Sequence, residues 1–400
     1  MRAFSFEGEK PMATTGYFAA QDTNNLTIGL ARETTWGTPP TGTYEGMRVQ
    51  SFGLGENTNR TRPNEIRPDM QASAAVTQDV QSSGGLQFAI SYGNQDLVWP
   101  TLFTGDWTND LAISDTDIAA DATAKTFSGA AGTFSAVALG QWVKVSGFSA
   151  AGANGYFRVT AKASDGASIT VDPAPATDAG GEAVTVSGSL LVNSTVVNTL
   201  SIQERYSTTH GFIYSGCIAS GGQINAARGQ FFSGTIDLIA KSEEKAASAV
   251  GTMGAAPTNR VFNTVGNMRA IALGSLTGAK VDSLTTTIAR EGAAANFALG
   301  DPGAIGVTLG TFTVSGQIKL YFSDYSAYDL YKSEAAIRTS YQVTDKAGNS
   351  YIVELPEIVL GKVTRERGGP NQPVMATFEW MADPHPTLGW TMGINRFPAA

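Results

Sequence analysis

Apolar and polar residues alternate in three stretches of the chain, and the three stretches share a motif. Each starts with Ser-Gly and then places an apolar residue at every second position, in residues 83–90, 233–238 and 315–320. A period of two puts the apolar side chains on one face of a β-strand and the polar ones on the other. The glycine indicates a bend or a close backbone approach at the start of each strand.

A helix signal follows each of these strands. Asn94, Ser242 and Ser326 are residues typical of a helix N-cap, and an acidic residue lies within the next few positions in each case. This pattern predicts short helices over residues 94–99, 242–245 and 326–331. A strand followed by a short helix, three times over, indicates an internally repeated unit.

The spacing of the repeats indicates an inserted domain. Ser83 and Ser233 are 150 residues apart, whereas Ser233 and Ser315 are 82 apart. Residues 111–190 are rich in Ala, Gly, Ser, Thr and Asp and hold several short alternating runs separated by turn signals. Short strands at this spacing predict a small β-sandwich or barrel. We therefore expect residues 108–190 to form an inserted Ig-like β-domain that folds on its own core.

The remaining alternating segments predict a mainly β fold. We expect an antiparallel β-sandwich or barrel body with short helices, built discontinuously from residues 26–107 and 191–400. Residues 1–25 are weakly patterned, and we expect them to form an N-terminal arm.

Residues 55–82 have a different composition, with many polar and charged residues and few apolar ones. Such a segment predicts a loop that is either solvated or ordered by a partner. Its charges are of both signs and are suited to pairing between neighbouring subunits; the candidates are Glu56, Arg60, Arg62, Glu65, Arg67 and Asp69.

The amino-acid composition argues against several classes of function. Charged residues make up 16% of the chain, against roughly 25% in typical soluble domains, so much of the surface is expected to be covered in an assembly. The net charge of -8 argues against a surface that grips nucleic acid, because such a surface is basic. Cys217 is the one cysteine, which excludes an internal disulfide and a cysteine-based metal site. No apolar stretch is long enough to predict a membrane-spanning helix.

Candidate catalytic chemistry is nearly absent. His210 and His385 have no ligand or base partner at a recognisable spacing, and no nucleophile-elbow or phosphate-loop motif is present. Asp115, Asp117 and Asp121 lack the spacing and the closing Glu of a calcium loop. We therefore predict no enzyme activity, no cofactor and no metal, although paired carboxylates brought together by folding leave no sequence trace.

The order of these patterns resembles that of the tail tube proteins of long-tailed bacteriophages. The resemblance lies in residues 26–29, in residues 214–218 through 234–238, and in residues 281–285 through 315–322. It extends over 26–107 and 191–395, and the inserted residues resemble the Ig-like decorations of such proteins.

The resemblance implies a subunit of the phage tail. Its members form six-membered rings that stack into a tube, and DNA passes through the lumen without specific binding. It also implies tape measure, tail terminator and distal tail proteins as partners, and assembly in the host cytoplasm. If edge strands pair with the edge strands of neighbouring copies, no exposed sheet edges remain. We expect the polar strand face to line the lumen, with Gln87, Ser91, Asp237, Gln317 and Lys319 as candidates; ordinary solvent or a helix is the alternative neighbour.

Two other functions stay open at this point. A carbohydrate-binding or adhesin-like surface protein is suggested by the inserted domain and by the aromatic residues Trp142 and Tyr156. An enzyme on a β scaffold has weaker support. Tubes or rings in electron micrographs would favour the structural subunit over both.

Overall fold

The structure is a computed structural model that describes residues 20–274, 276, 279–301 and 303–399. Most of the predicted arm lies outside this range; its described end holds one short 3-10 turn, η1 (Thr23–Asn25). The described chain is dominated by antiparallel strands, with two short α-helices, α1 (Trp99–Phe103) and α2 (Ser326–Lys332). The prediction of a mainly β fold with short helices is confirmed.

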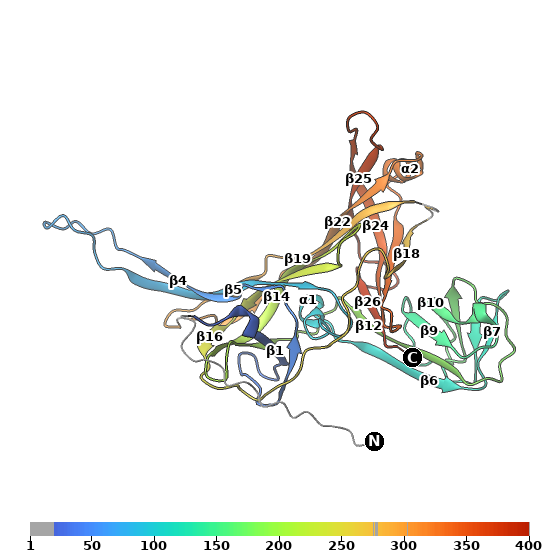
Figure 1. Ribbon diagram of the computed structural model, residues 1–400, viewed down its shortest axis with the longest axis horizontal. Coiled ribbons are helices and arrows are strands. Elements are labelled where there is room, and N and C mark those ends of the chain that lie inside the picture. The colour runs from blue at the N-terminus through green and yellow to red at the C-terminus, as the bar shows by residue number, and fades with distance from the viewer. Residues whose placement is uncertain (1–19, 275, 277–278, 302, 400) are drawn as a thin grey trace, which may run out of the picture.

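A long twisted sheet forms the centre of the molecule (Figure 1). Its neighbouring strands, in spatial order, are β5 (Val76–Ala89), β15 (Ser233–Ala240), β14 (Gly211–Ala227), β19 (Val281–Glu291), β22 (Thr311–Tyr321), β25 (Met375–Ala382) and β24 (Ser350–Glu366). The three repeated stretches therefore lie in one sheet, on β5, β15 and β22.

Further strands extend this sheet at both ends. Beyond β5 lie β3 (Ser51–Phe52) and β4 (Gly55–Thr61). Beyond β24 lie β23 (Ile337–Thr344) and β18 (Met268–Leu273), and also β26 (Gly393–Phe397), which pairs with β12 (Val184–Val192). A smaller group pairs around the other half of β14: β1 (Thr27–Arg32), β2 (Thr43–Met47), β13 (Leu200–Arg205), β16 (Ser242–Lys245) and β17 (Thr252–Met253). The hairpin of β20 (Ala294–Asn296) and β21 (Gly306–Thr308) stands apart.

The apolar face of the main sheet supports the principal core. The alternating residues of the repeats, among them Leu86, Phe88, Ile236, Leu238 and Ile318, are all buried there. Helix α1 packs on this face, and the buried guanidinium of Arg290 donates to the carbonyl of Leu102 at 2.9 Å and so satisfies the end of the helix. The alternation therefore determines which face of each strand is buried.

The glycines of two repeats are needed because an aromatic ring lies over each of them. Gly234 is paired with Phe88 across the strands, and Gly316 is paired with Trp380. A Cβ on Gly316 would lie 2.4 Å from Trp380 Cζ2 and 2.0 Å from the Thr285 carbonyl oxygen. The predicted close approach is present, but only the second Ser-Gly begins its strand, because β5 and β22 begin several residues earlier.

The prediction of a helix after each repeat is correct only for the third copy, where α2 forms. The first copy turns through Asn94, whose side chain accepts from the Arg48 backbone N–H at 2.8 Å, and α1 begins later, at Trp99. The second, Ser242–Lys245, is strand β16 and pairs with β14. A polar N-cap residue followed by acids is a local signal that tertiary strand pairing overrides.

The prediction of a loop over residues 55–82 is correct for residues 62–75 and wrong for residues 55–61 and 76–82, which are strands. Strand β4 pairs with the first half of β5, from Gly55 opposite Ser83 to Thr61 opposite Val76, and this hairpin forms a long arm that leaves the body (Figure 1). Neither face of the arm is buried in a core, so its strands carry no apolar alternation. That alternation was the signal from which strands were predicted.

A second hydrophobic core lies between residues 111 and 186, and its members include Phe127, Phe134, Val143, Val159 and Val186. It is formed by β6 (Thr108–Asp115), β7 (Ala119–Asp121), β8 (Thr126–Ser128), β9 (Trp142–Ser146), η2 (Ala151–Ala153), β10 (Gly155–Lys162), β11 (Ser168–Asp172) and the first half of β12. We call residues 108–190 the inserted unit. The division into an N-terminal arm (residues 1–25), a discontinuous body and this inserted unit remains our proposal.

Cys217 provides a simple check of the core. It is fully buried on β14, and burial raises the pKa of its thiol. We expect a thiol reagent to leave the folded protein unlabelled at neutral pH and to label one thiol per chain in denaturant, as measured by mass spectrometry. Rapid labelling of the folded protein would show that β14 is not buried in this way.

Candidate functional site: the polar face of the main sheet

The strand register aligns polar side chains in rows across the sheet. One row runs through Gln87, Thr235, Gln223, Thr287 and Ser315, which are successive cross-strand partners on β5, β15, β14, β19 and β22. Directly opposed residues share a face of the sheet. This face is therefore lined by amide and hydroxyl groups, on the side opposite the core.

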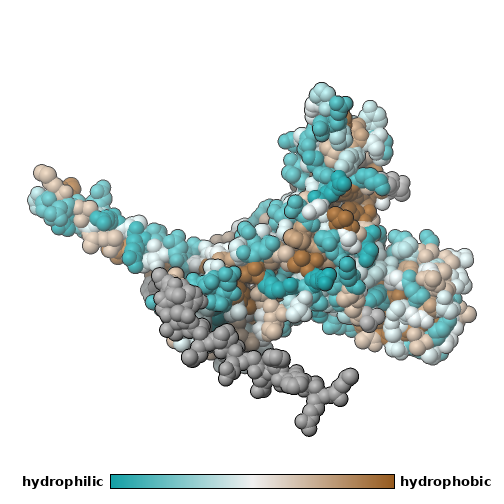
Figure 2. All heavy atoms as spheres, in the orientation of Figure 1, coloured by the Kyte–Doolittle hydropathy of each residue, from teal (hydrophilic) through white to brown (hydrophobic). Residues whose placement is uncertain are grey.

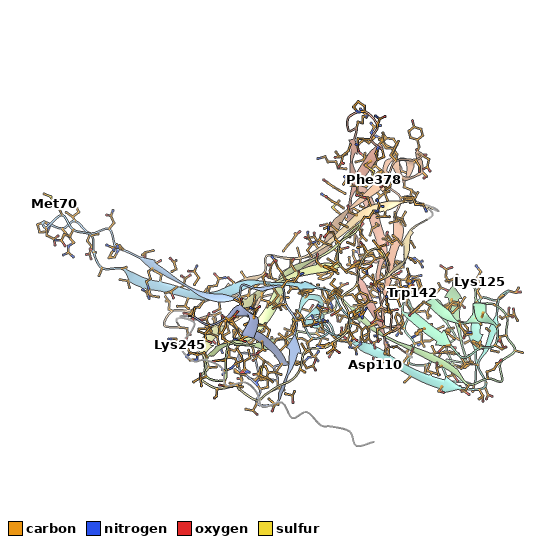
Figure 3. The ribbon with its side chains drawn as sticks, in the orientation of Figure 1. Met70, Asp110, Lys125, Trp142, Lys245 and Phe378 are labelled. Atoms are coloured by element: carbon orange, nitrogen blue, oxygen red, sulfur yellow. The ribbon has the colours of Figure 1, made fainter. Side chains whose placement is uncertain are left out.

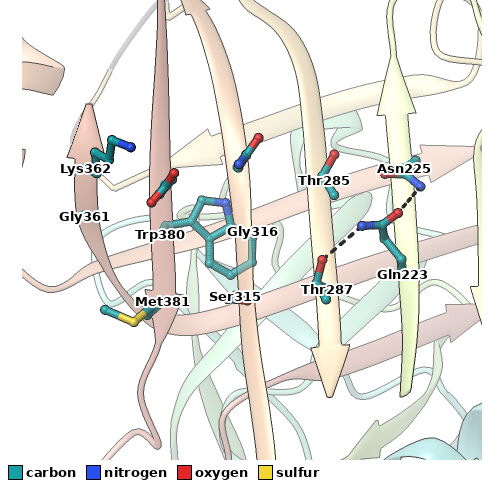
Figure 4. Close-up of a pocket in the computed structure, with 12 residues that line it drawn as sticks. Gln223, Asn225, Thr285, Thr287, Ser315, Gly316, Gly361, Lys362, Trp380 and Met381 are labelled. Atoms are coloured by element: carbon teal, nitrogen blue, oxygen red, sulfur yellow. Dashed lines mark hydrogen bonds between the residues drawn. The ribbon is translucent and has the colours of Figure 1, made fainter. Parts of the chain in front are cut away.

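A second row lies beside the first, formed by Asn225, Thr285, Gln317 and Glu379. Hydrogen bonds fix the side chains at the β14 end of the two rows: Asn225 Nδ2 donates to Gln223 Oε1 at 2.8 Å, and Gln223 Nε2 donates to Thr287 Oγ1 at 3.1 Å (Figure 4). The amides thus hold one another in place and still present polar atoms to solvent.

The members of these rows on β14, β19, β22 and β25 line a shallow open groove of about 650 Å³, and a second groove of about 350 Å³ continues it toward Lys319 and Glu366. The charged side chains that line the two grooves are Lys319, Lys362, Glu366 and Glu379, two of each sign. Lys319 Nζ lies 2.6 Å from Glu366 Oε2, and this hydrogen bond raises the pKa of Lys319. The grooves are therefore polar and close to neutral.

Asp237 adds a carboxylate to the same face. It lies opposite Gly85 on β5 and Gly221 on β14, and the glycines leave room for its side chain, since a Cβ on Gly85 would come within 3.0 Å of Asp237 Oδ1. Partial burial raises the pKa of this carboxyl. The face has no nucleophile with an adjacent base, and among the residues that the structure describes no three His, Cys, Asp or Glu side chains are grouped to hold a metal ion.

Four of the five residues predicted to line a lumen lie on this face: Gln87, Asp237, Gln317 and Lys319. Ser91 does not. It is fully buried, and its hydroxyl accepts a hydrogen bond from Arg48 Nη2 at 2.6 Å. Strand β5 ends at Ala89, so the alternation that assigned Ser91 to the polar face no longer applies beyond that point. We withdraw Ser91 from the candidate face.

The polar residues of β14 and β19 were not predicted to belong to this face, although the signal was present. Polar residues alternate at Gln223 and Asn225 and at Thr285 and Thr287, with buried Ile224 and Thr286 between them. The predicted residues of the face all came from the Ser-Gly repeats and the residues just after them. The strands between the repeats carry the same pattern.

Several strand edges have no neighbouring strand within the described part of the chain, and two of them are on β4 and β24. The outer edge of β4 has no strand beside it, because β4 pairs only with β5. Residues 359–366 of β24 pair only with β25, whereas the first half of β24 pairs with β23 and β26. Open edges of this kind are available for strand pairing with another chain.

An extended polar face with open edges suits a protein whose surface is completed by assembly. A family model described as phage tail tube protein matches residues 23–382. The chain belongs to the phage tail tube protein family. This tail tube protein is therefore a structural protein of the virion tail and not an enzyme, and the resemblance seen in the sequence is confirmed.

A search of curated proteins returns no match to this tail tube protein. In the described residues no helix is both long and apolar enough to cross a membrane.

The residues predicted to contact other subunits lie on the hairpin arm. Glu56 and Arg60 are on β4, whereas Arg62, Glu65, Arg67 and Asp69 lie in the connection between β4 and β5, which we call the arm tip (residues 62–75). Arg67 Nη2 lies 2.7 Å from Asp69 Oδ2 in the same chain. This hydrogen bond lowers the pKa of Asp69, so these two charges are already paired within the tip.

Two apolar residues on the arm tip were not among the predicted contact residues. Ile66 and Met70 are exposed by 104% and 97%. Figure 3 places Met70 at the end of the arm, and Figure 2 shows a small hydrophobic area there on a largely hydrophilic arm. The two exposed apolar side chains make the arm tip a candidate contact surface.

The aromatic residues that suggested carbohydrate binding are already engaged within the chain. Trp142 Nε1 donates to Glu354 Oε2 at 2.9 Å, and the Tyr156 hydroxyl lies 2.7 Å from Ser350 Oγ. Both contacts point toward the body. The rings are engaged as well, since the Arg338 guanidinium lies 5.9 Å from the Trp142 ring centroid and the Phe397 ring lies 5.1 Å from the Tyr156 ring.

Proposed function

We propose that this tail tube protein assembles into six-membered rings that stack into a tube, and that the polar face of the main sheet lines the lumen through which phage DNA enters the host. The single observation that carries the proposal is the continuous face of amide and hydroxyl groups across β5, β15, β14, β19 and β22. The family match supports a tail structure, and the ring number and the channel are our inference.

The open edges support ring closure. The outer edge of β4 and residues 359–366 of β24 are edges without a neighbouring strand in the sheet that carries the polar face. Joining such edges between neighbouring copies satisfies their backbone groups and closes the sheet into a barrel. We place the arm tip and residues 1–25 at contacts between rings, and the inserted unit on the outside, away from the DNA.

The near-neutral grooves support passage of DNA without retention. Each lysine or arginine that neutralises a phosphate adds affinity through counterion release. Two lysines balanced by two glutamates give little net attraction. The proposed partners beyond copies of the chain are the tape measure, tail terminator and distal tail proteins, through which the tube would join the rest of the tail.

Added positive charge on this face should slow DNA ejection. In phage carrying Gln87→Lys with Gln317→Lys, we expect tubes of normal length and ejection slowed roughly tenfold at low salt, with recovery as salt rises. Ejection is followed by the fluorescence of a DNA-binding dye after receptor triggering.

Gln87→Met with Gln317→Met is the matched control, since it changes size and polarity but adds no charge. A lysine at the exposed Ala124 of the inserted unit controls for total charge. Normal ejection of the double lysine phage at low salt, with tubes intact, would contradict the lumen assignment.

A further inference from the structure

A buried carboxylate lies where the inserted unit meets the body. Glu354 is on β24 of the body and is 0% exposed. Two side chains of the inserted unit reach it: Trp142 Nε1 donates to Oε2 at 2.9 Å, and Arg158 Nε lies 2.9 Å from Oε1. Figure 3 shows Trp142 on the side of the inserted unit nearest the body.

A body residue completes this cluster. Arg338 of β23 places Nε 3.7 Å from Glu354 Oε1 and Nη1 3.6 Å from Asp172 Oδ2 of the inserted unit. Burial raises the pKa of the Glu354 carboxyl and lowers that of Arg158, and the attraction between opposite charges acts against both shifts. A buried charge is tolerated only when it is paired, and here part of the pairing comes from each side of the junction.

The backbone ladder also crosses this junction. The first half of β12 pairs with β6 and β9 inside the inserted unit, and its second half pairs with β26 of the body. Asn395 of β26 accepts the Trp142 backbone N–H at 2.9 Å. The two parts therefore share a continuous sheet rather than a flexible linker.

Aromatic side chains also pack across the junction between the inserted unit and the body. The Phe397 ring lies 5.1 Å from the Tyr156 ring, edge to face. It also lies against Gly188, where a Cβ would come within 2.7 Å of Phe397 Cε1 and where the backbone has φ +146°. The last described strand of the chain thus packs against β10 and β12 of the inserted unit.

From these contacts we infer that the inserted unit is held rigidly against the body by the ion pairs of Glu354 with Arg158 and Arg338. We infer also that the unit and the body unfold together in one cooperative transition. The inference concerns a single chain and does not depend on the ring or the lumen. It also changes an expectation from the sequence: the unit has its own core, yet its removal would leave Glu354 and Arg338 without Arg158 and Trp142.

The test compares Arg158→Met, Glu354→Gln and the double variant in the full-length chain by differential scanning calorimetry. We expect one transition in the unmodified protein, containing both parts. Each single substitution should lower its midpoint by roughly 5 °C or more, and the double variant by less than the sum, because removing one partner of a buried pair costs more than removing both. Arg228→Met, at an exposed turn position, is the matched control and should leave the midpoint unchanged.

Hydrogen exchange provides a second readout, and its first comparison needs only the unmodified protein. In the unmodified protein, the backbone amides of β9 and β24 should exchange with the same free energy of opening. In Arg158→Met, the amides of β26 should be the first to lose protection against exchange. Two separate transitions in the unmodified protein, or a midpoint unaffected by Arg158→Met, would overturn the inference. An unchanged body transition after replacement of residues 108–190 by a short linker would overturn it as well.

Discussion

Gly316→Val is expected to lower the free energy of unfolding by roughly 3–5 kcal/mol and to leave little soluble protein. The added Cβ would meet the Thr285 carbonyl oxygen at 2.0 Å and the Trp380 ring at 2.4 Å. Either the β19–β22 pairing opens or the buried indole leaves its site, and both disturb the core beneath the polar face. Urea denaturation followed by circular dichroism measures the loss.

Gly55→Val is the matched control for this substitution. Gly55 also lies in a strand, but a Cβ there has no atom within 4 Å. Valine suits a strand and restricts the unfolded chain, so its stability should be unchanged or slightly higher. Equal stability of the two variants would show that the rings over the repeat glycines are not packed as described.

Removing the arm tip is expected to abolish tube formation while the subunit still folds. Thr61 and Val76 are cross-strand partners, so residues 62–75 can be replaced by Asn-Gly, a two-residue hairpin turn. The tip contributes no residue to either large core, so the midpoint of thermal unfolding should stay within a few degrees. Under the proposed assembly the deletion removes Ile66, Met70 and four charged ring-contact candidates together, and electron microscopy should find no long tubes.

Replacing residues 62–75 by a Gly/Ser sequence of the same length separates the contribution of the tip side chains from that of the length of the arm. This variant should fail to form tubes in the same way. Normal tubes from the Gly/Ser tip would mean that the tip side chains make no contact between rings. A large fall in the unfolding midpoint of the shortened variant would mean that the tip belongs to the fold and not to an interface.

The sequence predicted the strands that bury one face in a core. Alternation placed Leu86, Ile236 and Ile318 correctly, and the repeat glycines correctly indicated close approach, because both depend on local geometry that burial imposes on a strand. The same signal was missing from β4 and the outer half of β5, where both faces are polar, and these strands were predicted as a loop. The prediction of a helix at residues 242–245 is wrong because pairing with β14 holds that segment in a strand conformation.

The candidate face could be predicted only in part. Gln87 and Gln317 were found because they lie in the repeats, and Gln223 and Thr285 were missed although they alternate in the same way. Cross-strand register, which aligns these residues in rows, depends on pairing between distant segments and is not written in any one of them. The junction at Glu354 shows the same limit, since Arg158 and Glu354 are far apart in sequence and neither has an unusual local context.

The most direct test is a cryo-electron microscopy reconstruction of the assembled protein. We predict stacked rings of six subunits, with Gln87, Gln223 and Gln317 facing a hollow axis and the arm tip of each subunit in contact with a neighbouring ring. A tube with this polar face on its outer surface, or a protein that stays monomeric at every concentration and with every tail partner supplied, would contradict the account.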